Sequence, residues 1–162
     1  MSARAFWTRV AAATALAAAL AVALAPPHPP QRVSEALGLV TGAAAGLTLF
    51  VAAVRRAPAF VGVGPRAAAV WKQLFFAVCA ANEEVLWRWV ILGELLRLGP
   101  APALAISSAG FAIAHPRARA LHLSTGATFG LVYLGTGVLA ASITAHWIYN
   151  ALVASLAERA PP

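Results

Sequence analysis

Two adjacent glutamates lie within a stretch of the chain that is otherwise mostly apolar. Glu83 and Glu84 stand in the middle of residues 70–96, and Arg88 follows one helical turn later. An ionisable side chain at the centre of a bilayer costs about 2.5–3.5 kcal/mol on insertion scales, so such residues usually mark a functional site. Because three of them share one candidate membrane span, this span is where chemistry is expected.

Helix geometry predicts different roles for the two glutamates. Glu84 and Arg88 are four residues apart, so they share a face and can form a buried ion pair. Glu83 points away from Arg88 and has no partner on its own helix. A carboxylate held out of water without a countercharge is suited to act as a general base near neutral pH. The sequence therefore favours a structural role for Glu84 and a catalytic one for Glu83.

Two histidines on later spans can complete such a site. His146 and Asn150 are four residues apart, so an imidazole and a carboxamide share a face. Both can donate hydrogen bonds to one oxygen, as an oxyanion hole requires. His115 ends another span, where it can share a water with Glu83. Phe111 lies one turn before His115 and can wall the site.

The same residues form three motifs in a fixed order. EEVLWR at 83–88 fits E-E-x-x-x-R, FAIAH at 111–115 fits F-x-x-x-H, and HWIYN at 146–150 fits H-x-x-x-N. In this order, on successive spans, they resemble the CPBP intramembrane proteases. That family includes the type II CAAX prenyl endopeptidases, also called abortive-infection or lysostaphin-resistance-like proteins. The resemblance covers about residues 70–157.

The resemblance implies a role for each matching position. Glu83 and His115 would activate the attacking water, and His146 and Asn150 would stabilise the tetrahedral oxyanion. The positions that would support the site are Glu84 and Arg88.

Zinc is an alternative, because Glu83, His115 and His146 are all possible ligands of that metal. The family has been described both as metalloproteases and as glutamate proteases. We favour a metal-free mechanism without a cofactor, since the H-E-x-x-H signature of zincins is missing. Asn150 also suits a hydrogen-bond donor better than a zinc ligand.

The composition places these residues in a membrane. The chain has 162 residues, of which 61% are hydrophobic and 10% charged, whereas soluble domains carry about 25% charged residues. The net charge of +7 comes from basic residues scattered at span ends, so no nucleic acid is expected as a partner. Aspartate is absent, which excludes Ser-His-Asp triads and the paired aspartates of intramembrane aspartyl proteases.

The chain divides into six candidate spans joined by short connections. A membrane helix needs about 20 residues, and the spans are expected at 10–25, 34–54, 70–96, 102–115, 120–134 and 138–157. The first is expected to be retained, although its basic start and small residues also fit a cleaved signal peptide. We expect an all-α membrane bundle, a single domain over residues 1–162, with a protease core at 70–157.

Some residues in these spans are expected only to pack or to meet the membrane surface. Gly38, Gly42 and Gly46 recur at every fourth position, which either lets their helix approach a neighbour closely or reflects an Ala- and Gly-rich chain. His122 is expected at the membrane interface. Trp87 shares the face of Glu83 and is expected to line the substrate groove.

The basic residues other than Arg88 are divided unequally between the two sides of such a bundle. One side holds Arg32 and Arg97. The other holds Arg4, Arg9, Arg55, Arg56, Arg66, Lys72, Arg117, Arg119 and Arg159. Because positive residues favour the cytoplasmic side, both termini are expected there.

Together these features predict an intramembrane endopeptidase that cuts near the cytoplasmic side of the bilayer. Its substrate would be a membrane-anchored protein or peptide, cut in a lipidated tail or in a C-terminal sorting or transmembrane segment. The composition is typical of high-GC bacteria, so the bacterial plasma (inner) membrane is the expected location. The alternative is a non-catalytic protein: a scaffold, a bacteriocin-immunity-type protein, or a proton or ion pathway. The sequence leaves the oligomeric state open.

Overall fold

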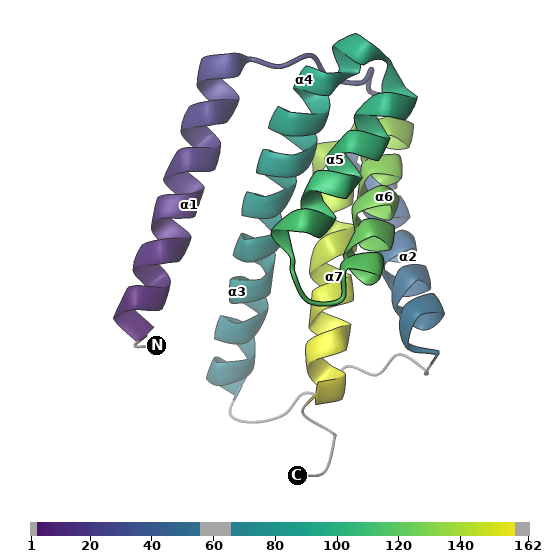
Figure 1. The fold of residues 1–162 in the computed structure, drawn as a ribbon. Helices are drawn as coiled ribbons and strands as arrows, with labels where there is room; N and C mark the ends of the chain where they lie inside the picture. The colour runs from purple at the N-terminus through teal and green to yellow at the C-terminus, as the bar shows by residue number, and fades with distance from the viewer. Residues whose placement is uncertain (1–2, 56–65, 158–162) are drawn as a thin grey trace.

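The apolar stretches of the sequence form helices throughout the part of the chain that the structure describes, residues 3–55 and 66–157 (Figure 1). In this computed structural model the elements are α1 (Ala3–Leu24), α2 (Glu35–Val54), α3 (Arg66–Glu84), the π-helix η1 (Val85–Leu92), α4 (Gly93–Leu95), the 3-10 helix η2 (Leu96–Leu98), α5 (Pro100–Ala114), α6 (Arg119–Thr136) and α7 (Leu139–Ala157). Since η1, α4 and η2 continue α3 without a break, the described residues form six helical rods. No strand occurs in the described residues, so the all-α prediction is confirmed.

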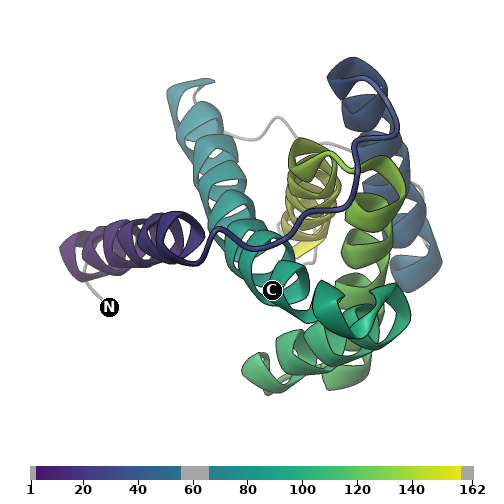
Figure 2. The same cartoon turned by 90° about the horizontal axis from the view of Figure 1, so that it is seen from above.

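Helix α7 lies at the centre of the bundle. It packs against α2, α3 and α6, while α1 lies outside, against α3 and η1. Figure 2 shows α1 and α2 on opposite sides, joined by residues 25–34, which cross over one end of the bundle. We call this connection the strap. Because the chain traverses the bundle six times, residues 3 and 157 lie at the same end (Figure 1).

The strap packs against the turn between α6 and α7 and is hydrogen-bonded to it. Gly137 ends α6 with a φ of 70°, a left-handed conformation that glycine adopts without strain, and its N–H donates to Tyr133 O at 2.8 Å. A side chain at Gly137 would collide with Pro30 of the strap. The neighbouring Arg32 N–H donates to Thr136 O at 2.9 Å. The strap can therefore pack against this turn only because position 137 is a glycine.

The glycines of α2 bring it close to α7. Gly38, Gly42 and Gly46 are all buried. A Cβ atom built on Gly42 or Gly46 would run into the carbonyl oxygen of Ala141 or Ala145 on α7. The spacing of these glycines thus serves close helix packing, the first of the two readings that the sequence allowed.

The long rod over 66–98 is not the uniform α-helix that its sequence suggests. It changes to π-helix directly after Glu84, and the Gly93 N–H donates to Arg88 O, five residues back. The Trp87 carbonyl within this segment accepts from Ser107 Oγ on α5 at 3.0 Å. Because this contact joins residues that are far apart in the sequence, the local sequence around Trp87 does not predict the π-helix. Single π turns are often found at functional sites.

Two helical segments are long and apolar enough to cross a membrane. They are Glu35–Val54 and Leu139–Leu156. Val10–Leu24 and Pro100–Ala114 are apolar but shorter. The six rods match the predicted number of helices, whereas composition and length single out two of them as spans. The remaining rods are too short or too polar to meet this measure, α3 because it carries Lys72, Glu83 and Glu84.

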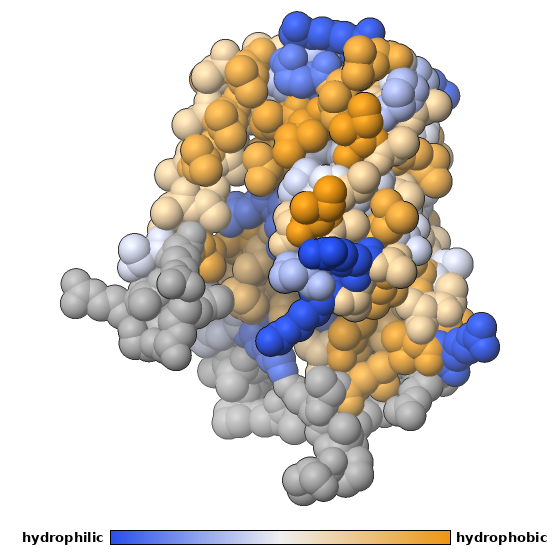
Figure 3. All heavy atoms as spheres, viewed as in Figure 1, coloured by the Kyte–Doolittle hydropathy of each residue, from blue (hydrophilic) through white to orange (hydrophobic). Residues whose placement is uncertain are grey.

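Apolar side chains cover much of the molecular surface in Figure 3. A hydrophilic patch interrupts them over the connection between α5 and α6, where Arg117 and Arg119 are exposed. This connection lies toward the end of the bundle that holds residues 3 and 157. The strap, which carries Arg32, and the turn after α4, which carries Arg97, lie at the other end (Figure 1). Arg56 and Arg159, which the topology prediction also counted, lie outside the described residues.

Candidate active site

Residues from each of the three motifs line one cavity. Glu83 comes from the last turn of α3, His115 from the C-terminal cap of α5, and His146 and Asn150 from the middle of α7. The cavity has a volume of about 150 Å³, enough to admit several waters. It is lined by Glu83, Phe111, His115, His122, Thr125, Phe129, His146, Tyr149 and Asn150.

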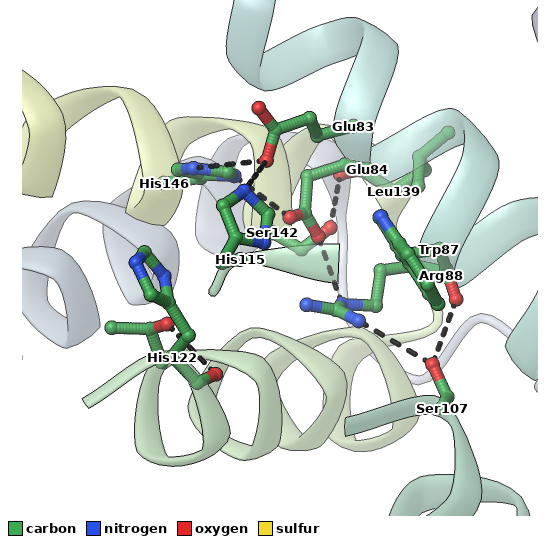
Figure 4. Close-up of polar contacts among 11 residues, drawn as sticks. Glu83, Glu84, Trp87, Arg88, Ser107, His115, His122, Leu139, Ser142 and His146 are labelled. Carbon is green, nitrogen blue, oxygen red and sulfur yellow. Dashed lines mark hydrogen bonds and ion pairs between the residues drawn. The ribbon is translucent and has the colours of Figure 1, made fainter. Parts of the chain in front are cut away.

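The Glu83 carboxylate lies between the two predicted catalytic histidines (Figure 4). Glu83 Oε2 is 3.7 Å from His115 Nε2 and 3.9 Å from His146 Nε2. The side chains of Glu83 and His115 are 36% and 30% exposed, whereas that of His146 is 6% exposed. The acid and the first histidine therefore face the open side of the cavity, and the second histidine forms its inner wall.

Glu84 binds two partners from two helices. Its Oε2 pairs with Arg88 Nε at 3.1 Å, as the four-residue spacing predicts. Its Oε1 accepts from His146 Nδ1 at 2.9 Å, a contact between α3 and α7 that the spacing did not predict. Glu84 and Arg88 are fully buried, so each charge is balanced inside the protein. Glu84 thus connects Arg88 on η1 to His146 on α7.

Arg88 is held from three sides. Besides Glu84, its Nη1 donates to Ser107 Oγ at 3.4 Å, and its guanidinium lies 5.3 Å from the centre of the Phe111 ring. A cation over an aromatic face is stabilised by the ring quadrupole. Phe111 therefore supports the buried charge on one side and walls the cavity on the other.

The orientation of His115 follows from its position at the end of α5. Its Nδ1 lies 2.8 Å from Phe111 O, the carbonyl one turn earlier. A carbonyl oxygen only accepts, so Nδ1 carries the proton and donates it. In the neutral ring, Nε2 is then an acceptor, and it is the nitrogen that faces Glu83.

His122 and Phe129 on α6 are site residues that the sequence did not reveal. His122, expected at the membrane interface, lines the cavity, and its ring lies 4.4 Å from that of His115 at an interplanar angle of 24°. The Phe129 ring lies 4.6 Å from that of His146 at 21°. The seven-residue spacing puts both rings on one helix face. Which face that is depends on the turn between α5 and α6, which spacing alone does not determine.

Trp87 does not take the place expected for it. It is absent from the cavity lining, and its ring packs edge-on against Phe111 at 5.7 Å and 87°. A Cβ atom on Gly110 of α5 would collide with the Trp87 ring. The expectation assumed an α-helix between Glu83 and Trp87. The π turns after Glu84 change the direction of the side chains that follow.

The donor atoms of Glu83, His115 and His146 do not form a metal site as they stand. Within residues 3–55 and 66–157, no group of three or more His, Cys, Asp or Glu side chains is placed to hold a metal ion. Zinc holds N and O ligands at about 2.0–2.2 Å, so ligands on one zinc would lie closer together than the 3.7 Å and 3.9 Å separations seen here. The cavity that the three side chains line has room for water beside them.

The sequence of this region matches a known family. The model of the family described as "Type II CAAX prenyl endopeptidase Rce1-like" matches residues 65–152, more than half of the chain. All three motifs fall within the matched segment. No curated protein and no solved structure matches the chain. The family is one of membrane-embedded proteases, and this chain belongs to it as a member of the type II CAAX prenyl endopeptidase Rce1-like family.

Proposed function

We propose that the chain is an intramembrane endopeptidase that hydrolyses a peptide bond in the cavity between α3, α5, α6 and α7. One observation carries the proposal: Glu83 Oε2 lies within 4 Å of the Nε2 atoms of both His115 and His146, in a cavity large enough for water. Family membership supports proteolysis in general. The roles of the individual residues are inferred from the geometry.

Glu83 and His115 activate the attacking water. A water between them donates one hydrogen to the Glu83 carboxylate and the other to His115 Nε2, which is an acceptor because Nδ1–H is bonded to Phe111 O. Its free lone pair then attacks the carbonyl carbon while Glu83 takes a proton. When the C–N bond breaks, Glu83 returns this proton to the leaving amine. The carboxylate thus serves first as base and then as acid.

His146 and Asn150 stabilise the oxyanion. His146 donates Nδ1–H to Glu84, so its Nε2 donates to the oxyanion only when the ring carries a proton on both nitrogens. The Asn150 amide, one turn further on the same face of α7, supplies the second donor. Two preorganised donors in a cavity shielded from bulk water are the arrangement that lowers the barrier to acyl transfer most effectively.

The substrate in this proposal is a membrane-anchored protein or peptide, cut in a lipidated tail or a C-terminal transmembrane or sorting segment. The position of the connection between α5 and α6 favours this choice, since it directly follows His115, carries the exposed Arg117 and Arg119, and lies toward the end of the bundle where α1 begins and α7 ends (Figure 1). By the positive-inside rule this is the cytoplasmic end. The proposed location is the plasma membrane of a bacterium.

A proteomic comparison tests the proposal. Cells that lack the chain are complemented with the wild type or with Glu83→Gln, and the C-termini of membrane proteins are sequenced by mass spectrometry. The proposal predicts uncut tails without the chain, cut tails with the wild type, and uncut tails again with Glu83→Gln. Identical C-termini in all three strains, with the protein present and folded, would favour a non-catalytic scaffold instead.

A chelator tests the metal-free part of the mechanism. Because the proposed mechanism uses no metal, 1,10-phenanthroline at millimolar concentration should leave cleavage by the purified protein unchanged, and elemental analysis should find less than one zinc per chain. Activity that is lost with the chelator and restored by zinc would overturn the metal-free mechanism and leave the protease assignment intact.

A further inference from the structure

Helix α6 presents an aromatic ring to each of the two histidines in the proposed mechanism. His122 stacks on His115 at a centroid distance of 4.4 Å, and Phe129 stacks on His146 at 4.6 Å. Both pairs are nearly parallel, at 24° and 21°. None of the three motifs contains a residue of α6. The two stacks therefore point to a function for a helix that the motifs leave unassigned.

We propose that His122 and Phe129 are positioning residues, which fix the ring planes of His115 and His146 for hydrolysis. This inference rests on the function proposed above. Neither ring has to touch the substrate carbonyl, because each acts through the histidine against which it packs.

His115 needs such support because little else restrains its ring. It is the C-terminal cap of α5, its side chain is 30% exposed, and one hydrogen bond, from Nδ1–H to Phe111 O, orients it. The terminal torsion of a histidine side chain has broad, shallow minima. The Phe111 ring contacts it at 4.5 Å with a 41° tilt, so His122 supplies the more nearly parallel surface. Without that surface, Nε2 can swing away from Glu83.

His146 is held more firmly, and Phe129 is the part of its support that α6 provides. Its Nδ1–H is bonded to the buried Glu84 carboxylate, which fixes one edge of the ring. Phe129 is fully buried and covers one face of the ring. Together these contacts restrict tilting of Nε2 away from the cavity.

Helix α6 is rigid enough to serve as the reference surface. A Cβ atom on Gly126 would lie 3.3 Å from Ser108 Cα on α5, and one on Gly130 would collide with the Leu104 side chain. Such close contacts restrict sliding of one helix along the other. Near the start of α6, the His122 N–H donates to Ala118 O at 3.1 Å and Thr125 Oγ1 donates to His122 O at 3.1 Å.

The test compares variants that keep or remove the ring at position 122. His122→Phe keeps a flat ring without ionisable nitrogens, whereas His122→Leu removes it. Leu123→Ala is the matched control, because Leu123 is 46% exposed and does not line the cavity. Cleavage is followed in proteoliposomes with a quenched fluorescent peptide that carries a tail sequence found cut in cells.

Positioning predicts a loss of kcat with KM nearly unchanged. His122→Leu and Phe129→Leu should each lower kcat by about 10- to 100-fold, the range expected when a catalytic group is misplaced by about 1 Å. KM should stay within about twofold, and His122→Phe should recover most of the lost kcat. Leu123→Ala should match the wild type in both constants.

A second measurement needs no substrate. Diethyl pyrocarbonate modifies accessible imidazoles, and mass spectrometry gives the rate for His115 alone. This rate should rise several-fold in His122→Leu and stay near the wild-type value in His122→Phe. An unchanged rate in His122→Leu would overturn the inference.

Three kinetic results would also overturn it: full activity in His122→Leu, equal losses in His122→Phe and His122→Leu, and a loss that parallels the amount of folded protein. Glu83→Gln in the same assay separates this failure from that of the proposed function. An active Glu83→Gln contradicts the proposed function itself. An inactive Glu83→Gln beside an unimpaired His122→Leu contradicts only the positioning role.

Discussion

In the mechanism proposed above, His115 and His146 have opposite tasks, and their Nδ1 atoms have different partners. His115 donates to the neutral Phe111 carbonyl, which leaves its Nε2 free to accept a hydrogen from water. His146 donates to Glu84, a carboxylate already paired with Arg88, and its Nε2 points at the second carboxylate, that of Glu83. In that mechanism His115 accepts a hydrogen through Nε2, whereas His146 donates one from Nε2 only when both of its ring nitrogens carry protons.

The oxyanion role predicts the kinetic behaviour of Asn150 variants. Asn150→Ala removes one donor and should lower kcat by about 10²- to 10³-fold, with a small change in KM, because the bond strengthens only as the oxyanion forms. Ser155→Ala on the same helix is the control, since the Ser155 hydroxyl bonds only to Ala151 O in the described residues, away from the cavity. A change in KM alone would show that Asn150 binds the substrate and does not act on the transition state.

The double role of Glu84 predicts that stability and activity separate. Glu84→Gln leaves the buried Arg88 without its countercharge and should lower the free energy of unfolding by about 3–5 kcal/mol. Adding Arg88→Met removes the orphaned charge and should recover most of this stability. Activity should stay at least about 100-fold low in the double variant, because His146 still lacks its carboxylate. A double variant that recovers both would reduce Glu84 to a purely structural residue.

The helices were largely predictable from the sequence, because local signals determine them. The apolar stretches predicted where the helices lie, and Gly99 with Pro100 predicted a turn between two of them. The four-residue spacing within each motif predicted which residues share a helix face. The π turns of η1 and the places of His122 and Phe129 in the cavity were not predictable. These depend on contacts between α5 and its neighbours, such as that of Ser107 with the Trp87 carbonyl, which no local pattern encodes.

The contact between α2 and α7 gives a sharp prediction about helix packing. Gly42→Ala places a methyl group against the Ala141 carbonyl oxygen and should destabilise the fold by about 1–3 kcal/mol through overpacking. Gly135→Ala on α6 meets nothing within 4 Å and should be neutral or stabilising by up to about 1 kcal/mol. Thermal unfolding in detergent micelles measures both. Equal unfolding temperatures would mean that the two helices are not in close contact.

The two ends of the molecule are formed by different connections. The strap, which carries Arg32, crosses one end, while the connection between α5 and α6, which carries Arg117 and Arg119, lies toward the other (Figure 1). An even number of traversals returns the chain to the end at which it starts. The distribution of arginines predicts that this end faces the cytoplasm.

Cysteine labelling in intact cells tests this orientation. With Cys79, the single cysteine of the chain, replaced by serine, a membrane-impermeant maleimide should label Arg32→Cys directly. Arg117→Cys should react only after the cells are permeabilised. Both positions are exposed, so access to the reagent depends on the side of the membrane. The reverse pattern would place the connection between α5 and α6 outside the cell.

The claim on which all else depends is that Glu83 is the base of a hydrolytic site. The most direct measurement is the rate at which purified wild type and Glu83→Gln cut the same tail peptide in proteoliposomes, with equal folding verified by thermal unfolding. The structure predicts a loss of about 10²- to 10⁴-fold in kcat for Glu83→Gln, the range for a general base, and an unfolding temperature close to that of the wild type. Cleavage at the wild-type rate by a folded Glu83→Gln protein would contradict the account.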